Sequence, residues 1–228
     1  MDDSNTIEPE LAPCPAGDDR CTNLAEVLRL REEVKQLSNM VRTDDLTGLF
    51  NFRYFNQALS LEMERTRRTG QSTCLIMFDL DHFKRVNDVH GHEVGNIVLK
   101  HIAALVKKTV RRLDIPCRYG GEEFTIVLPN TTLRQGVRFA NRLRLIVENS
   151  PVDAGSTVLG IAASFGVDVY NPGATMSENE FIEKVDGFLY LAKQKGRNQV
   201  CHAEFEPEVA VSGDEKSALL SGFSDGET

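Results

Sequence analysis

The chain has 228 residues, of which 41% are hydrophobic and 26% are charged, and its formal net charge is −8. This length suits one globular domain with a core that needs no disulfide or metal support, and it leaves some chain to spare. An acidic chain is a poor candidate for nonspecific binding to nucleic acid, so we expect no nucleic-acid partner.

The charge is spread unevenly along the chain. Residues 1–20 contain six acids and one base, and residues 204–228 contain seven acids and one base, so residues 21–203 carry a net charge of +3. The first segment also contains three prolines, and the last is rich in serine and glycine. We therefore predict disordered acidic tails at 1–22 and 204–228, around a domain at 43–203.

Cysteines and apolar runs bear on the compartment. The five cysteines show no Cys-x-x-Cys pair and no zinc spacing, and an odd count without a signal peptide favours a reducing environment. The apolar run at 74–78 is far too short to cross a bilayer, and the N-terminus has no charged-then-apolar targeting pattern. The sequence therefore predicts a cytoplasmic protein without a membrane segment.

The first predicted element is a helix over 23–42. Apolar residues recur there at the spacing of heptad positions a and d: Val27, Leu30, Val34, Leu37 and Val41. Such a narrow stripe suits a short parallel coiled coil, although it spans only about two heptads. We expect a helical stalk that pairs two chains, and the alternative is a helix that lies on its own domain.

The later elements alternate between strand and helix patterns. In chain order we predict a helix from about 53, a strand over 72–78, a loop over 81–91, a helix around 94–105, strand–turn–strand over 117–128, a helix over 133–147, a strand over 157–169, a helix around 182–192 and a strand over 199–201. The continuous apolar run at 72–78 indicates a central strand. This order predicts an α+β fold, a split β-α-β-β-α-β mixed sheet covered by helices.

Two pairs of acids follow predicted strands. Asp79 and Asp81 end the central strand, and Glu122 and Glu123 follow the Gly-Gly turn of the hairpin. Adjacent strands lie about 5 Å apart, so these acids can converge at one edge of the sheet. Clustered carboxylates repel one another unless they are protonated or bound to cations, and Mg²⁺ prefers such oxygen ligands. Either pair alone would favour a solvated turn, whereas together they favour a metal site.

Three cationic side chains could offset the negative charge of these acids. Lys84 follows the first pair, and Lys193 and Arg197 lie four residues apart near the end of the last helix. Such groups can bind nucleotide phosphates, although a basic helix C-terminus is also favourable to the helix dipole. The sequence has no Gly-x4-Gly-Lys-Ser/Thr loop, so the chain is not a P-loop protein.

The segment Arg-Tyr-Gly-Gly-Glu-Glu-Phe at 118–124 closely resembles the signature of the GGDEF domain of diguanylate cyclases. Further matches occur in the family's order: Asp-Leu-Thr-Gly-Leu-Phe-Asn at 45–51, Asp-Leu-Asp-His-Phe-Lys at 79–84 with Asn87 and Asp88, Gly-His at 91–92, Ser-Phe-Gly at 164–166, and Lys-x-x-Gly-Arg-Asn at 193–198. The resemblance covers about residues 43–202 and implies a fold akin to nucleotidyl cyclases and polymerase palms.

The resemblance also implies a reaction, in which two GTP molecules are joined into cyclic di-GMP with loss of two pyrophosphates. Each chain would hold one GTP, so catalysis would need a homodimer. The family uses Mg²⁺ or Mn²⁺, with two ions expected per active half-site. Two metal ions can lower the pKa of the attacking 3′-hydroxyl and neutralise the charge of the leaving group.

Site roles follow from the same resemblance. The metal ligands would be Asp79, Glu122 and the carbonyl of Leu80, with Glu123 assisting. The phosphates would be bound by Lys84, Lys193 and Arg197. Guanine would be read by Asn87 and Asn96, in a pocket that includes Phe83 and Leu99.

A second site is implied by Arg-x-x-Asp upstream of the Gly-Gly turn. Arg111 and Asp114 match the family's product-inhibition site, and Arg142 aligns with a secondary contact from a partner domain. Arginine stacks on purines, and a carboxylate accepts hydrogen bonds from guanine. The motif alone would be an ordinary surface pair. Its spacing from the turn favours binding of cyclic di-GMP.

One departure from the family concerns Asn96, where aspartate is usual. An amide offers guanine one acceptor where a carboxylate accepts from both donors, so we expect weaker guanine selectivity with GTP still the main substrate. Two alternatives follow: a cyclase with relaxed purine selectivity, and a catalytically weak receptor of cyclic di-GMP that uses Arg111 and Asp114. The intact Gly-Gly-Glu-Glu turn argues against the receptor.

Overall fold

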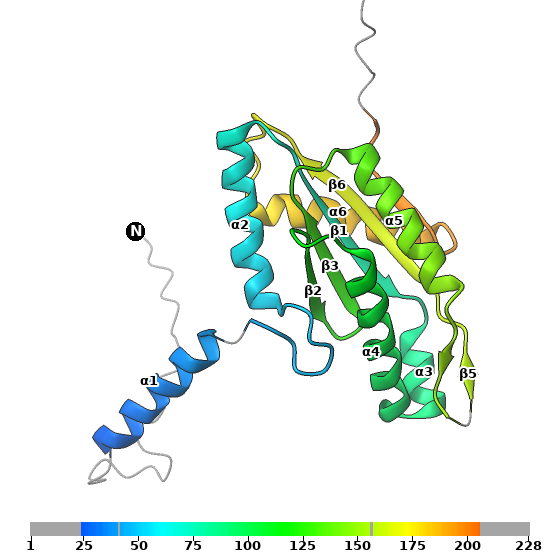
Figure 1. Cartoon of the computed structure of the whole chain (residues 1–228), viewed down its shortest axis with the longest axis horizontal. Coiled ribbons are helices and arrows are strands. Elements are labelled where there is room, and N and C mark those ends of the chain that lie inside the picture. The colour runs from blue at the N-terminus through cyan, green and yellow to red at the C-terminus, as the bar shows by residue number, and fades with distance from the viewer. Residues whose placement is uncertain (1–23, 41, 156, 206–228) are drawn as a thin grey trace, which may run out of the picture.

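A five-stranded mixed sheet forms the centre of the fold (Figure 1). The computed structural model describes residues 24–40, 42–155 and 157–205. The strand order is β2-β3-β1-β6-β7, antiparallel except for the parallel pair β6–β7. The strands are β1 (Thr73–Leu80), β2 (Ile115–Gly120), β3 (Glu123–Leu128), β6 (Ala163–Tyr170) and β7 (Val200–His202). This order confirms the predicted α+β fold.

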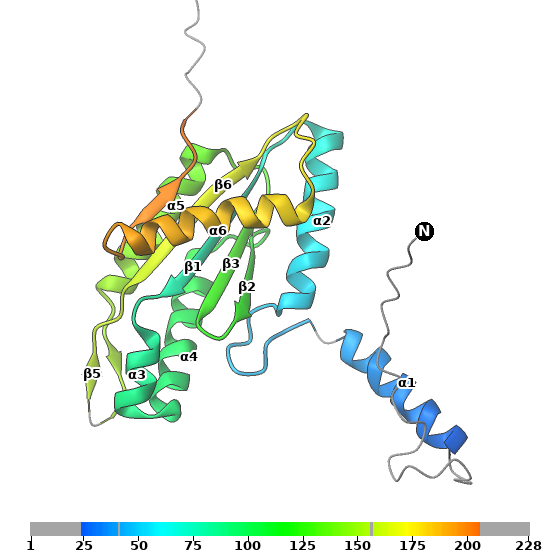
Figure 2. The same cartoon turned by 180° about the vertical axis from the view of Figure 1, so that it is seen from behind.

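Helices cover both faces of the sheet. They are α2 (Phe52–Thr69), α3 (Phe83–His90), α4 (His92–Thr109), α5 (Leu133–Glu148) and α6 (Glu178–Gln194). Figures 1 and 2 show α4 and α5 on one face, and α6 with α2 on the other. Helices α5 and α6 each begin at a capping box, from Thr132 and Ser177, which satisfies N–H groups that a helix start leaves free.

Strand β1 is the centre of the core, and all eight of its residues are buried. Successive side chains of a strand point to opposite faces, so Ile76 and Phe78 pack under α4 and α5, while Leu75 and Met77 pack against α2 and α6. A strand buried on both faces needs the continuous apolar run that the sequence shows. The prediction of a central strand is therefore confirmed.

Two of the predicted elements are wrong in detail. Residues 83–90 form helix α3 instead of a loop, because the buried Phe83 anchors a short helix on the core. The predicted strand over 157–169 is interrupted at 160–162. Its first part, β5 (Val158–Leu159), pairs with β4 (Val152–Asp153) in a separate hairpin, and only β6 joins the main sheet.

Helix α1 (Leu24–Met40) stands apart from the sheet in Figures 1 and 2. Its apolar residues Leu30 and Val34 are 45% and 61% exposed, so they lack a partner surface among the described residues. Val41 lies outside the described residues, as do the predicted tails except Glu204 and Phe205. None of the helices in the described part of the chain has the length and apolar character that a bilayer crossing requires.

Candidate active site

The acids of the two strand ends lie side by side at one edge of the sheet. Antiparallel pairing of β1 with β3 sets Asp79 directly opposite Glu123, and the N–H of Leu80 donates to the carbonyl of Glu122 over 3.4 Å. Gly121 permits the tight turn between β2 and β3, because its φ of +48° lies in the left-handed region that favours glycine. The turn places Glu122 and Glu123 at the start of β3, and the pairing of β3 with β1 brings them to Asp79.

Lys193 is the cation that reaches this edge. Its Nζ lies 2.9 Å from Oδ2 of Asp79. Burial raises the pKa of Asp79, the charges of Glu122 and Asp81 raise it further, and Lys193 opposes the change. Burial and the charge of Asp79 also raise the pKa of Glu123. The cluster thus carries more negative charge than its one paired lysine offsets.

Gly166 explains how Lys193 comes so close. A Cβ atom at this position of β6 would collide with the backbone of Val185 and Leu189 in α6. Glycine lets α6 lie directly against the sheet, so that the last turn of the helix carries Lys193 over the end of β1. The Ser-Phe-Gly segment at 164–166 includes this glycine, but the sequence alone does not show that α6 packs against it.

The donors at this edge fit a divalent cation that arrives with its own ligands. Among the described residues, no group of three or more His, Cys, Asp or Glu side chains is placed to hold a metal ion. The edge offers the carboxylates of Asp79 and Glu122 and the main chain at Leu80. Mg²⁺ is commonly bound through one or two carboxylates together with substrate phosphates, so this donor set suits a metal–nucleotide complex.

Asp81 lies close enough for its charge to raise the pKa of Asp79, but its own carboxylate is held by neutral donors. Its Oδ1 accepts from the hydroxyl of Ser164 over 2.7 Å, and its Oδ2 accepts from the backbone N–H of Asn198 over 3.0 Å. Both carboxylate oxygens are therefore used in joining β1 to β6 and to the loop after α6.

Arg118 lies beside the acidic turn, and its role was not predicted from the sequence. Its Nε and Nη2 donate to the carbonyl of Gly121 over 3.0 and 2.9 Å, while Nη1 bonds the carboxylate of Asp44 over 3.1 Å. Asp44 also accepts from the N–H and hydroxyl of Thr47. Burial alone would raise the pKa of Asp44, but the bonds from Thr47 and Arg118 outweigh it and hold the pKa below its ordinary value. Arg118 thus fastens the acidic turn to the segment that follows α1.

The residues expected to bind the base lie on α3 and α4. A Cβ at Gly95 would collide with the side-chain oxygen of Asn87 and crowd the ring of Phe83, so glycine permits the close approach of the two helices. Asn96 is half-buried beside it, and Leu99 is buried. The structure therefore groups these residues at the junction of α3 and α4.

Two of the predicted phosphate ligands stay apart from the acids. Lys84 on α3 and Arg197 after α6 are exposed, and within the described part of the chain neither side chain forms an ion pair. Of the three predicted cations, Lys193 alone contacts an acid of the cluster in the described structure.

The Arg-x-x-Asp motif forms a closed turn between α4 and β2. Oδ2 of the buried Asp114 accepts from the N–H of Arg111 over 2.7 Å, and the N–H of Asp114 donates to the carbonyl of Arg111 over 3.1 Å. Burial raises the pKa of Asp114, and the N–H and charge of Arg111 oppose the rise. One oxygen of Asp114 is therefore occupied by its own turn, and the side chain of Arg111 is left exposed.

Arg111 and Arg142 meet across a cavity of about 330 Å³. Its lining residues are Arg111, Gln135, Arg138, Phe139 and Arg142. The guanidinium of Arg142 lies over the ring of Phe139, 5.3 Å from its centroid, and donates to the carbonyl of Thr109 over 3.4 Å. The structure thus joins two of the predicted residues and adds Arg138, which the sequence analysis did not single out.

The fold and the acidic turn define an α+β domain with a cluster of acids at one edge of its sheet. A family model described as "Diguanylate cyclase, GGDEF domain" matches residues 41–199. The chain belongs to this family.

Curated relatives and solved structures agree with the match. The chain is 36% identical over 173 residues to the response regulator PleD of Caulobacter vibrioides, covering 75% of this chain and 38% of that protein. It is 36% identical over 178 residues to diguanylate cyclase VdcA of Vibrio cholerae, covering 77% and 51%. The chain spans about half or less of the length of these relatives.

Two solved structures share the fold. The coiled coil and GGDEF domain of DgcB from Caulobacter crescentus, in complex with c-di-GMP, superimposes with a TM-score of 0.69 at 31% identity, covering 78% of this chain and 94% of that one. The diguanylate cyclase SiaD of Pseudomonas aeruginosa, in complex with its activator SiaC, gives 0.69 at 35% identity, covering 79% and 72%.

Proposed function

We propose that this chain is a diguanylate cyclase that condenses two GTP molecules into cyclic di-GMP and two pyrophosphates. The observation that supports this most is the cluster of Asp79, Glu122 and Glu123 at one sheet edge, with Lys193 on the carboxylate of Asp79. A cluster with excess negative charge suits Mg²⁺ carried by a nucleotide triphosphate. Family membership makes GTP the expected nucleotide.

Each residue of the site has a proposed role. Asp79, Glu122 and the carbonyl of Leu80 would hold two Mg²⁺ or Mn²⁺ ions, which would lower the pKa of the 3′-hydroxyl and neutralise the charge of the leaving pyrophosphate. Lys193 would bind a phosphate in place of the carboxylate of Asp79. The other proposed roles are phosphate binding by Lys84 and Arg197, guanine binding by Asn87 and Asn96, walls of the base pocket from Phe83 and Leu99, and assistance at the metal by Glu123.

A homodimer is part of the proposal, because the 3′-hydroxyl of one GTP must reach the α-phosphate of the other. The exposed Leu30 and Val34 of α1 support a paired stalk. Pairing would hold the two domains at a high effective concentration. DgcB, which shares the fold, was crystallised with its coiled coil.

Product binding is proposed for the cavity that Arg111 and Arg142 line. Its cations suit the phosphates and purines of cyclic di-GMP, and the free oxygen of Asp114 can accept from guanine. The complex of DgcB with c-di-GMP supports a dinucleotide as a ligand of this fold.

The cytoplasm is the proposed location. Cys74, Cys117 and Cys201 are free and buried. Burial raises the pKa of the Cys117 thiol to about 12, so this thiol stays protonated and unreactive at neutral pH. Free cysteines of this kind suit a reducing compartment.

The testing experiment incubates the purified chain with GTP and Mg²⁺ at a series of protein concentrations and separates the nucleotides chromatographically. We expect cyclic di-GMP, with a rate per chain that rises with concentration as dimers form. E122Q should abolish product, whereas the matched control E64Q on α2 should not. A dimeric sample that makes no product, even as the R111A variant, would overturn the cyclase in favour of a receptor.

Relaxed purine selectivity is a second candidate because Asn96, and not a carboxylate, lies half-buried beside Gly95. The same assay with equal GTP and ATP measures it. We expect GTP to be preferred, and N96D to increase the preference about tenfold, since a bidentate base contact is worth roughly 1–3 kcal/mol. Equal use of both nucleotides by the unmodified chain would contradict the preference for GTP.

A further inference from the structure

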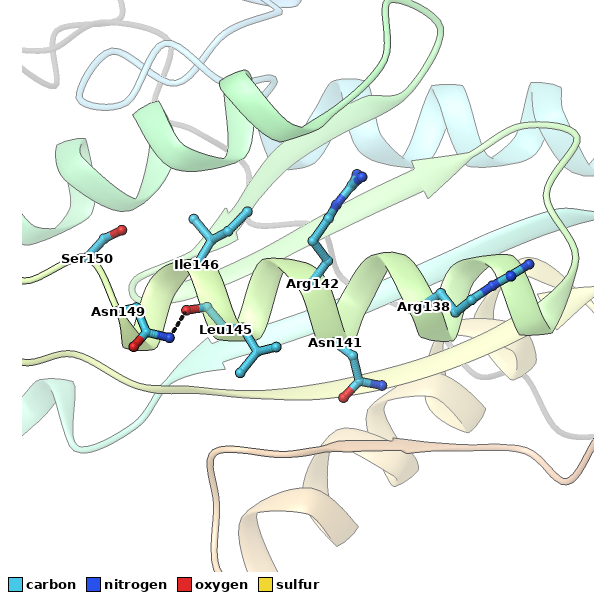
Figure 3. Close-up of a pocket in the computed structure, with 7 residues that line it drawn as sticks. All are labelled: Arg138, Asn141, Arg142, Leu145, Ile146, Asn149 and Ser150. Carbon is cyan, nitrogen blue, oxygen red and sulfur yellow. Dashed lines mark hydrogen bonds between the residues drawn. The ribbon is translucent and has the colours of Figure 1, made fainter.

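Three arginines follow one face of α5. Arg134, Arg138 and Arg142 recur every four residues and are exposed, and Ile146 continues the row. Residues four apart share a helix face. Figure 3 shows Arg142 and Ile146 projecting to the same side of α5, with Arg138 nearer the start of the helix. We call Arg134, Arg138 and Arg142 the arginine stripe.

Arg138 and Arg142 have few acids on their own helix. Glu148 is the one acid of α5, and it pairs with Arg144 over 3.0 Å. Within the described part of the chain, Arg138 forms neither a hydrogen bond nor an ion pair. Arg138 and Arg142 therefore present cationic charge that the acid of their own helix does not offset.

An open groove of about 630 Å³ runs along the same helix (Figure 3). Its lining residues are Arg138, Asn141, Arg142, Leu145, Ile146, Asn149 and Ser150. The groove is cationic at Arg138 and Arg142 and apolar further along α5, at Leu145 and Ile146, where Leu145 is 47% exposed. An occupant should therefore present acids first and apolar side chains next.

The described part of the chain ends at Phe205, beside the start of α5 and the cationic end of the groove. After β7, Phe205 lies against the guanidinium of Arg134, with 4.8 Å from Cζ to the ring centroid. In Figure 1 the orange C-terminal segment accordingly ends beside the first turn of α5. The next residues of the chain thus begin at the first arginine of the stripe.

The sequence that follows has the required order. Residues 206–228 contain six acids and one base, beginning with Glu206 and Glu208, and apolar Val-Ala-Val follows at 209–211. With a helix rise of about 1.5 Å per residue, Arg138 and Arg142 lie roughly 6 and 12 Å beyond Arg134, and Ile146 about 18 Å. With about 3.3 Å per residue, an extended segment after Phe205 brings the two acids beside the arginines and residues 209–211 beside Ile146.

We propose that residues 206–211 dock along α5 of their own chain, with the acids on Arg138 and Arg142 and the apolar residues on Leu145 and Ile146. Exposed ion pairs are individually weak, so the docked state is one that a tighter ligand can displace. Arg138 and Arg142 also line the cavity shared with Arg111. The segment therefore competes with cyclic di-GMP there, a consequence that rests on the proposed product site.

Docking is tested by cross-linking in the full chain. R138K keeps the charge and supplies an amine that a water-soluble carbodiimide couples to a carboxylate in direct contact. Peptide mass mapping should find position 138 joined to Glu206 or Glu208. The cross-link should disappear in 1 M salt and in the added E206Q/E208Q variant. R85K, an exposed position on α3, is the matched control and should give no cross-link to these acids.

Mixing ¹⁴N- and ¹⁵N-labelled chains separates contacts within one chain from contacts between chains. A cross-link confined to one isotope supports docking in the same chain. Absence of the cross-link, or its occurrence only between labelled and unlabelled chains, would overturn the proposal.

Competition is tested by calorimetric titration with cyclic di-GMP. E206Q/E208Q should bind the dinucleotide about threefold to tenfold more tightly than the unmodified chain, because a larger fraction of molecules has a free site. The control D225N/E227Q removes equal charge and should change the affinity less than twofold. Equal affinities of all three proteins would overturn competition. If none binds cyclic di-GMP, the proposed product site fails, while the cross-link still decides docking.

Discussion

Two buried carboxylates lie two residues apart at the end of β1 and are held in opposite ways. Asp81 gives both oxygens to neutral donors fixed by the fold, the hydroxyl of Ser164 and the N–H of Asn198. Asp79 instead faces the charged side chain of Lys193 and the acids Glu122 and Glu123. Each residue is only 9% exposed, so burial does not distinguish them.

The difference lies in how the cost of burying a charge is met. Neutral donors in fixed positions stabilise one carboxylate in one place, and such an acid serves the structure. An acid whose pKa is raised by burial and by like charges gains most from a cation, and such acids gather at functional sites. We therefore propose that Asp79 takes part in the chemistry and that Asp81 supports the surrounding fold.

The largest expected effect is that of D79N. The substitution removes a proposed metal ligand and should lower cyclase activity by about 10³-fold, roughly 4 kcal/mol in the barrier. The free energy of unfolding should change by less than about 1 kcal/mol, because the lost ion pair with Lys193 is offset by reduced repulsion from Glu122. Initial rates and urea unfolding measure the two quantities. Activity within tenfold of the unmodified chain would show that Asp79 is not at the reacting centre.

D81N should show the reverse pattern. An amide can accept one of the two hydrogen bonds, but its NH₂ group then faces the other donor, so we expect a loss of about 2 kcal/mol in the free energy of unfolding. Urea unfolding at neutral pH measures it. S164A, which removes one bond and keeps the carboxylate, is the control and should cost about 1 kcal/mol. Unchanged stability together with lost activity would move Asp81 into the reacting cluster.

Much of this arrangement follows from local sequence patterns. The apolar run of β1 predicted a central strand, and the position of both acid pairs at strand ends predicted that they could converge, because adjacent strands lie about 5 Å apart. The same patterns missed α3, since so short a helix owes its place to Phe83 and the core and not to its own periodicity.

Contacts between distant residues were beyond such patterns. Charge patterning alone could not separate Asp81 from Asp79, because the partners Ser164 and Asn198 arrive from β6 and from the loop after α6. The bonds from the guanidinium of Arg118 to both Asp44 and Gly121 likewise depend on how the segment after α1 packs beside the turn. Side-chain chemistry predicted which residues could act, and the tertiary fold decides which of them do.

R118K tests whether the frame supports the chemistry. Lysine keeps the charge but cannot bond Asp44 and the carbonyl of Gly121 together, so the acidic turn should lose its fixed position. We expect about a tenfold fall in activity, since small displacements of catalytic groups are costly, and unchanged dimer formation. The rate assay with size-exclusion chromatography measures both. R85K on α3 is the matched control. A variant with full activity would show that the turn keeps its conformation without the bonds from Arg118 to Asp44 and Gly121.

The smallest expected effect concerns Asp44, a second acid of the frame, and its pH dependence. Its pKa in the folded chain lies below the ordinary aspartate value, so the hydrogen bonds from Thr47 and the ion pair with Arg118 together contribute stability that is fully present above about pH 4. That contribution is lost as pH falls through the lowered folded-state pKa. Because both side chains are partly exposed, it should amount to less than about 1 kcal/mol.

D44N isolates this contribution. Urea unfolding of both proteins at pH 7, 5 and 3.5 should give a stability difference that is constant between the first two values and smaller at the third, because the unfolded chain then takes up a proton at Asp44 more readily than the folded chain does. A difference that persists unchanged at pH 3.5 would mean that the carboxylate charge of Asp44 does not stabilise the fold. Arg118 would then act through its bonds to Gly121 alone.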